Sequence, residues 1–209
     1  FRYGGCFDIG DVYCQFDALS GPADSYIMMV AHFDSRFRQA KLQKTVYSYG
    51  AGDDAYGVGS ILELLSQALK YRDEWHQGVR ILFTDSEENA LDGMKCAAKY
   101  NPELFENVGY VVNLESRGMN GPVLLFETSA NNENVLDLYS EAKAPYGYSL
   151  TTVVYRFLPN NTDFTIVKDS IPGINFSTID NINYYHVDDD NFENINLATI
   201  QHYGAQIEP

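Results

Sequence analysis

The stretch SYIMMVAHFDS, residues 25–35, is a continuous apolar run that ends in histidine and aspartate. Its apolar residues do not alternate with polar ones, which is typical of a strand buried on both faces of a sheet. The later segment VGSILELLSQALKY, residues 58–71, has one apolar stripe along a helix, at Val58, Ile61, Leu65 and Leu69. A doubly buried strand followed by an amphipathic helix predicts an α/β fold.

The alternation of strands and helices continues along the chain. Further strands are predicted at 79–88, 108–116, 121–129, 151–156 and 171–178. Further helices are predicted at 89–100, 131–144, 162–168 and 191–206. This order predicts an α/β three-layer sandwich, with a mixed but mostly parallel central sheet and helices on both faces. Ligands of such sheets lie beyond the carboxyl ends of the strands.

Length and charge restrict the class of protein. The 209 residues are enough for one domain with a proper core, and we predict a single domain over 1–209. The net charge of -15 disfavours nucleic acid and anionic membrane surfaces as partners. No run of about 18 apolar residues occurs, so no membrane span is predicted. The three cysteines form no metal motif, and Cys6 and Cys14 could pair across a hairpin.

Potential metal ligands and acid–base groups gather where the predicted strands end. They are His32 and Asp34, then Asp85, Glu87 and Glu88, then Glu115, with Asp53 from the loop before the first helix and His186 from a late loop. Each alone has an ordinary structural explanation, such as a helix cap or a solvated carboxylate. Their joint occurrence at one edge of one sheet predicts a metal site.

The loop GAGDDA, residues 50–55, fits by its letters the G-x-G-x-x-A turn of dinucleotide-binding proteins. Two aspartates stand where pyrophosphate would lie, so the charge contradicts that pattern. Asp73 is a candidate ribose ligand about 20 positions onward, but nothing else supports a dinucleotide site. We interpret Asp53 as a metal ligand, and Asp54 as a supporting hydrogen-bond partner or helix start.

Mixed imidazole and carboxylate ligands suit zinc, with cobalt or manganese as substitutes. Asp53, Glu88 and Glu115 carry three negative charges, and a bridging hydroxide would supply a fourth, which two divalent ions would balance. Five protein ligands for two metals require one bridging ligand, and a carboxylate can bridge whereas an imidazole normally cannot. Glu87, next to Glu88, is then free to act as a base.

Five ordered motifs resemble the co-catalytic zinc metallopeptidases of the bacterial leucyl aminopeptidase type, a family that includes glutamate carboxypeptidases and glutaminyl cyclases. They are AHFDSR (31–36), GAGDDAYGVGSILELL (50–65), TDSEENALDG (84–93), NLESRG (113–118) and YYHVDDDNFENI (184–195). The segments NLESRGMNGPVLLFETS, LPNNTDFTIVK and IQHYG look most like the branch of endoplasmic reticulum metallopeptidases and vacuolar membrane proteases. The resemblance covers about residues 25–205.

The resemblance implies a zinc aminopeptidase-like fold and two zinc ions that share a bridging carboxylate, Asp53. One ion would be bound by His32, Asp53 and Glu115, and the other by Asp53, Glu88 and His186. Glu87 would be the general base, and Asp34 would orient His32.

The chain departs from this family at several positions. Much of the family has aspartate at the position of Glu115, asparagine at that of Asp54 and a small residue at that of Tyr56. The family's catalytic domain usually begins with further helices, which we expect this chain to lack.

The resemblance implies hydrolysis of a terminal peptide bond, most readily by an aminopeptidase acting on peptides with a free N-terminus. Alternatives are a glutaminyl cyclase, which is an acyl transferase with a single zinc, and a peptidase-like binding module without catalysis. Members of the branch are membrane-anchored. We therefore expect an extracytoplasmic location (secreted, periplasmic or luminal), no membrane contact by this fragment, and an anchored parent protein.

Substrate contacts are less defined. Arg117 is a candidate contact for a substrate carboxylate or tetrahedral oxygen, and Tyr185 is a candidate cleft residue; the alternatives are a structural ion pair and packing. Asn161 and Asp163 either border the pocket or cap a helix. His202, on the predicted last helix, is expected to be structural.

Overall fold

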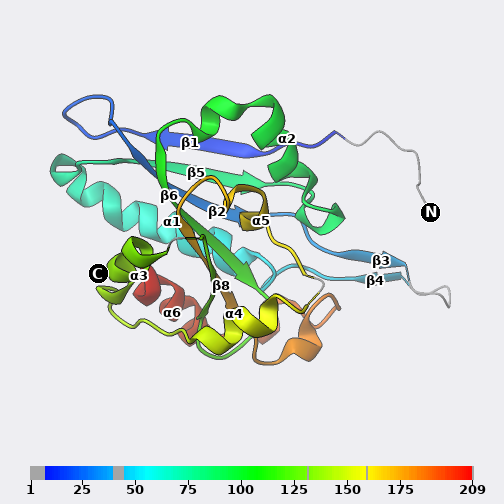
Figure 1. The fold of residues 1–209 in the computed structure, drawn as a ribbon. Helices are drawn as coiled ribbons and strands as arrows, with labels where there is room; N and C mark the ends of the chain where they lie inside the picture. The colour runs from blue at the N-terminus through cyan, green and yellow to red at the C-terminus, as the bar shows by residue number, and fades with distance from the viewer. Residues whose placement is uncertain (1–7, 40–44, 131, 159, 209) are drawn as a thin grey trace.

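A computed structural model describes residues 8–39, 45–130, 132–158 and 160–208 (Figure 1). Its main sheet has six strands in the order β1 (Val12–Phe16), β5 (Gly78–Thr84), β2 (Tyr26–His32), β6 (Val108–Ser116), β8 (Gly173–Thr178) and β7 (Leu124–Thr128). The four inner strands are parallel, whereas β1 and β7 run antiparallel at the edges. The predicted mixed, mostly parallel sheet is therefore confirmed.

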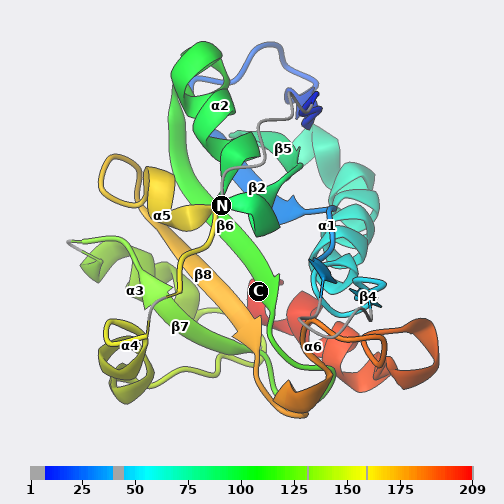
Figure 2. The same ribbon diagram turned by 90° about the vertical axis from the view of Figure 1, so that its right-hand side faces the viewer.

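Helices cover both faces of the sheet. One face packs against α1 (Ala55–Ala68), α3 (Glu133–Ser140) and α6 (Leu197–Ile207), and the other against α2 (Asp92–Tyr100) and α5 (Phe164–Val167). Figure 2 shows α1 and α5 on opposite sides of the sheet. In β2, Met29 and Ala31 face the first layer, whereas Met28 and Val30 face the second. Burial on both faces explains the uninterrupted apolar run.

The strand predicted at 151–156 is wrong, because this segment lies in helix α4 (Ser149–Tyr155). The segment around Tyr146 lies where such a strand would pair with β7. The backbone N–H of Leu125, in β7, donates to the carbonyl oxygen of Tyr146 at 2.9 Å. Val153 and Val154 are exposed, so the β-branched residues that suggested a strand bury no sheet face.

Other differences concern edges and ends. The edge strand β1 and the small hairpin of β3 (Phe37–Gln39) and β4 (Thr45–Tyr47) were not predicted, because short edge strands carry little periodic signal. The last helix begins at Leu197 instead of 191, since the Asn196 side chain accepts hydrogen bonds from the backbone N–H groups of Ala198 and Thr199.

Two further expectations concern a disulfide between Cys6 and Cys14 and the absence of a membrane span. Cys14 is exposed on β1, but Cys6 lies outside the described residues, so their pairing stays a prediction. Among the described residues, no helix is long and apolar enough to cross a bilayer.

Candidate metal centre

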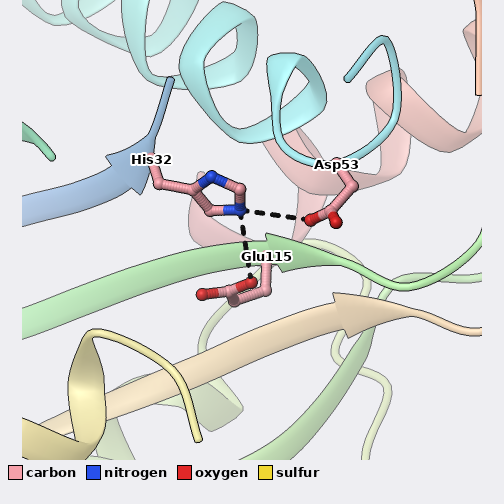
Figure 3. Close-up of side chains that lie close together, drawn as sticks. All are labelled: His32, Asp53 and Glu115. Atoms are coloured by element: carbon pink, nitrogen blue, oxygen red, sulfur yellow. Dashed lines mark hydrogen bonds and ion pairs between the residues drawn. The ribbon is translucent and has the colours of Figure 1, made fainter. Parts of the chain in front are cut away.

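His32, Asp53 and Glu115 meet beyond the carboxyl ends of β2 and β6 (Figure 3). The Nε2 atom of His32 lies 3.1 Å from Oδ1 of Asp53 and 3.9 Å from Oε2 of Glu115. All three side chains are buried. One imidazole nitrogen and two carboxylate oxygens so close together form a suitable ligand group for a divalent cation.

A second ligand group shares Asp53 with the first. Oδ2 of Asp53 lies 3.1 Å from Nε2 of His186, and that nitrogen lies 2.6 Å from Oε1 of Glu88. Oε1 of Glu88 is buried, and no described residue donates a well-oriented hydrogen bond to it. The ligand atoms of Asp53, Glu88 and His186 all lie within 4.8 Å of one another, as a second site for a cation requires. Asp53 thus presents one oxygen to each group, as a bridging carboxylate would.

Asp34 lies behind His32 and connects it to the glutamate pair. Nδ1 of His32 donates to the backbone carbonyl oxygen of Asp34 at 3.0 Å, and Oδ1 of Asp34 is 3.3 Å away. Because a carbonyl oxygen only accepts, Nδ1 carries a hydrogen, and Nε2 faces the ligand group. The two carboxylate oxygens of Asp34 also accept the backbone N–H groups of Glu87 and Glu88, at 3.0 and 3.2 Å. One side chain therefore orients both a histidine and the turn that carries the glutamates.

The acidic groups of the cluster are strongly perturbed in the metal-free protein. Burial and the charge of Asp53 raise the pKa of Glu115 to about 8, and burial and the charge of Glu115 raise that of Glu87 to about 10. Burial lowers the pKa of His32, but hydrogen bonds to Asp34 and Asp53 outweigh it, so this pKa lies well above its ordinary value. Bound protons therefore reduce the repulsion among these buried carboxylates, and metal cations in the cluster could take over that role.

The loop GAGDDA is held by a residue that sequence analysis did not single out. Oδ1 of the buried Asp190 accepts the N–H of Gly52 at 2.5 Å, and its Oδ2 accepts the Ser48 hydroxyl at 2.9 Å and the N–H of Asp53 at 3.4 Å. A Cβ at Gly52 would lie 2.5 Å from the Met119 sulfur, so a larger residue there would have to displace the Met119 side chain.

The two aspartates of the loop have different roles. Asp54 starts helix α1, as expected, because its side chain accepts the backbone N–H of Gly57 at 3.0 Å. The peptide bond between Asp53 and Asp54 is cis. Asp53 contacts the cluster through His32 and His186, whereas Asp54 contacts the first turn of the helix.

A buried chain of hydrogen bonds leads away from Glu115 across three strands. The amide of Asn113 donates to Oε1 of Glu115 at 3.4 Å and to Oδ1 of Asn175 at 2.9 Å. The Asn175 amide donates to Glu127 at 3.1 Å, and Glu127 accepts from Lys168 at 2.6 Å. Glu127 and Lys168 border a separate cavity of about 820 Å³ beside β7. Sequence analysis missed this chain, since its members are interspersed in apolar strands.

A smaller cavity of about 370 Å³ adjoins the cluster, and its walls include Glu87, Glu115, Arg117, Tyr185 and His186. The Tyr185 ring stacks on the His186 imidazole, with 3.5 Å between ring centres and 22° between planes. The Arg117 guanidinium lies 5.5 Å from the centre of the Tyr185 ring. Both candidate substrate contacts therefore border the cluster.

The remaining candidates divide between cavity and scaffold. Asn161 lines the cavity, whereas Asp163 is buried and accepts a hydrogen bond from Thr84. Asp163 takes the N-cap position of α5, as the helix-cap interpretation expected, but its side chain makes no capping hydrogen bond. Asp85 stays outside both ligand groups and accepts the N–H of Gly10 at 3.2 Å. His202 accepts the N–H of Val123 at 2.9 Å, as expected of a structural histidine.

A family model described as Peptidase family M28 matches residues 16–208, nearly the whole chain. The chain belongs to peptidase family M28. This family comprises zinc-dependent metallopeptidases, which agrees with the interpretation of the GAGDDA loop as metal-binding and gives no support to a dinucleotide site.

Two curated relatives of this M28 chain are proteases whose names refer to the endoplasmic reticulum or the vacuolar membrane. Endoplasmic reticulum metallopeptidase 1 of Mus musculus is 31% identical, over 96% of this chain and 22% of the relative. The vacuolar membrane protease of Paracoccidioides lutzii is 27% identical, over 84% of this chain and 17% of the relative. The chain thus spans about a fifth of the length of these relatives.

Solved structures confirm the fold of the M28 chain. The LapA aminopeptidase of Legionella pneumophila superposes with a TM-score of 0.67 at 20% identity, covering 94% of this chain and 53% of that one. The glutaminyl cyclase of Porphyromonas gingivalis superposes with a TM-score of 0.65 at 17% identity, covering 95% of this chain and 81% of that one. Similarity at this identity concerns the fold and does not separate the two activities.

Proposed function

We propose that the protein is a two-zinc exopeptidase, and specifically an aminopeptidase for peptides with a free N-terminus. The observation that carries this proposal is the position of Asp53, whose two oxygens lie 3.1 Å from His32 and 3.1 Å from His186. Each histidine also adjoins a further glutamate. Two ligand groups joined by one carboxylate fit a pair of cations, and the five donors are of the types that zinc prefers.

Zinc ions held there would polarise the scissile carbonyl and lower the pKa of water from 15.7 to about 7. Glu87 belongs to neither ligand group, yet it lines the same cavity as Glu115 and His186. It would take a proton from the attacking water and deliver it to the leaving amine. The surrounding carboxylates suit a substrate that carries a protonated α-amine.

The decisive experiment replaces Glu87 by glutamine, which keeps the size of the side chain but removes its basicity. We expect kcat to fall by about 10²–10⁴-fold, while two zinc ions per chain remain bound. Metal content and hydrolysis of aminoacyl amides would be measured together, with the exposed Glu103→Gln as a matched control. Full activity in Glu87→Gln would show that another group is the base.

A glutaminyl cyclase is the second candidate, because a cyclase superposes on the chain almost as well as an aminopeptidase does. The two functions differ in metal number and product. One zinc per active chain, together with cyclisation of peptides that begin with glutamine, would favour the cyclase. Cleavage restricted to free-amine substrates, lost with a chelator and restored by zinc, would favour the aminopeptidase. Absence of both activities and of bound metal would leave the binding module.

We further propose that residues 1–209 act as one catalytic domain of a membrane-anchored protein, on the extracytoplasmic side of the membrane. The names of the two curated relatives, which refer to the endoplasmic reticulum and the vacuolar membrane, support the association with a membrane. Protease digestion of a tagged parent protein in sealed membrane vesicles, with and without detergent, would test it. Digestion of the domain from the cytoplasmic side, without detergent, would contradict it.

A further inference from the structure

The Arg117 side chain has an unusual environment for an arginine beside a cluster of acids. It follows the end of β6, two residues after Glu115, and borders the cavity that also contains Glu87 and His186. Its Nε atom is buried and has no hydrogen-bond partner, and no described residue forms an ion pair or side-chain hydrogen bond with its guanidinium. The guanidinium lies 5.5 Å from the centre of the Tyr185 ring.

Arg80, another arginine within the fold, shows how a structural guanidinium is satisfied. Its Nε donates to Gln15 at 3.1 Å, and its Nη1 donates to the carbonyl oxygens of Leu104 and Glu106 at 2.9 and 2.6 Å. The group also lies 3.9 Å over the Tyr26 ring. Buried polar groups in folded proteins nearly always have such partners, so unused donors that face a cavity indicate a missing acceptor.

The chemistry of that acceptor follows from the guanidinium. Arginine presents a planar fork of N–H donors that matches a carboxylate, and it cannot lose its charge. Two further cations, Arg36 and Lys95, border the same cavity in a chain of net charge -15. Arg36 contacts Glu88 and Lys95 donates to the carbonyl oxygen of Ala90, whereas no described residue accepts a hydrogen bond from the Arg117 Nε.

The size of the cavity limits where the carboxylate can lie in a substrate. A volume of about 370 Å³ is near the lower end of ligand pockets. In a dipeptide, a single Cα separates the scissile nitrogen from the terminal carboxylate, and each added residue moves that carboxylate about 3.8 Å further. A substrate that reacts beside Glu87 and reaches Arg117 within this cavity is therefore short.

We infer that Arg117 binds a substrate carboxylate on the leaving side of the scissile bond, so that the preferred substrates are dipeptides. Cleavage of these substrates rests on the proposed peptidase function, whereas their binding does not. The carboxylate could be the terminal one or that of an acidic side chain, and the substrates below separate these two sources.

The test compares X-Ala dipeptides, their X-Ala amides and X-Asp amides, with X varied, on the zinc-loaded protein. We expect kcat/KM to be about 10- to 100-fold higher for dipeptides than for their amides, as for a hydrogen bond to a charged group. The ratio should fall to within about threefold in Arg117→Ala and stay intermediate in Arg117→Lys, which keeps the charge but not the fork. A preference for X-Asp amides instead would identify the side-chain carboxylate as the source.

Lys95→Ala is the matched control, because it removes a positive charge from the exposed rim of the same cavity. It should leave the ratio unchanged. An equal loss in this variant, or an Arg117→Ala defect of the same size for every substrate, would overturn the inference.

Calorimetric binding of the dipeptide and its amide to Glu87→Gln protein gives a readout independent of cleavage. Tighter binding of the dipeptide that disappears with Arg117→Ala supports the site even if the wild type hydrolyses nothing. That result would reject the proposed peptidase function and keep the carboxylate site at Arg117. Hydrolysis without any carboxylate preference in binding or kcat/KM would overturn the inference about Arg117 and leave the proposed peptidase function standing.

Discussion

Replacement of Asp190 by alanine tests how the bridging aspartate is held. Asp190 is 1% exposed, and its carboxylate accepts the N–H of Gly52 at 2.5 Å and the hydroxyl of Ser48 at 2.9 Å. It also accepts the N–H of Asp53 at 3.4 Å, which is a weak contact. Truncation at Cβ removes all of these acceptors and leaves the two close donors buried without partners.

The expected cost follows from those two donors. A buried donor that loses its partner costs about 1–3 kcal/mol, so the free energy of unfolding should fall by at least about 2 kcal/mol. In a domain of this length about 1 kcal/mol shifts Tm by about 2–4 °C, which gives a decrease of about 4–8 °C or more. Because the loop also carries Asp53, zinc should bind more weakly to Asp190→Ala.

Two further variants separate the hydrogen bonds from general damage to this loop. Asp190→Asn keeps an acceptor for Gly52, and its amide can donate to the Ser48 hydroxyl, so its loss should be much smaller. Asp189→Ala alters an exposed neighbour and should stay within about 0.5 kcal/mol of the wild type. Unfolding followed by circular dichroism, with and without zinc, measures all three. The reasoning fails if Asp190→Ala is as stable as Asp189→Ala, or if Asp190→Asn is as damaging as alanine.

Two other predictions concern metal and pH. Zinc at about 100 times its Kd should stabilise the folded protein by about 2.7 kcal/mol, and His186→Ala should lose most of this gain; a chelator that leaves Tm unchanged would argue against a bound metal. In the metal-free protein, burial raises the pKa of Glu115 from 4.5 to about 8. The folded state therefore binds more protons than the unfolded chain, and stability should decrease as pH rises from about 4.5 to 8. His32, whose folded pKa is also raised, acts in the same direction. Melts across this range would contradict the sign if Tm increased.

The ligand positions could be predicted from sequence for a physical reason. Strands buried on both faces produce uninterrupted apolar runs, so the first polar residue after each run marks the end of a strand. Parallel strands place those ends at one edge, which is why His32 and Glu115 were expected to meet. This prediction holds for residues far apart in the sequence, because the edge at which a strand ends depends on the direction of the strand.

Other parts of the site leave no such mark. Residues 188–190 are three consecutive aspartates. Asp188 and Asp189 are exposed, whereas Asp190 is buried against the GAGDDA loop. Its role depends on where a distant loop folds back, which local patterns do not encode. The error at α4 has the same origin: Val153 and Val154 suggest a strand, but the available sheet edge is already paired.

The buried chain from Glu115 through Asn113 and Asn175 to Glu127 also restricts how this protein can evolve. The Asn113 amide donates to Glu115 and to Asn175, whereas Asn175 accepts from Asn113 and donates to Glu127, so the orientation of one amide fixes the next. Replacing a single member by an apolar residue would leave a buried partner unsatisfied, so a tolerated change requires changes in its neighbours as well. We therefore expect positions 113, 127 and 175 to change as a group among homologues, even though they lie on three different strands.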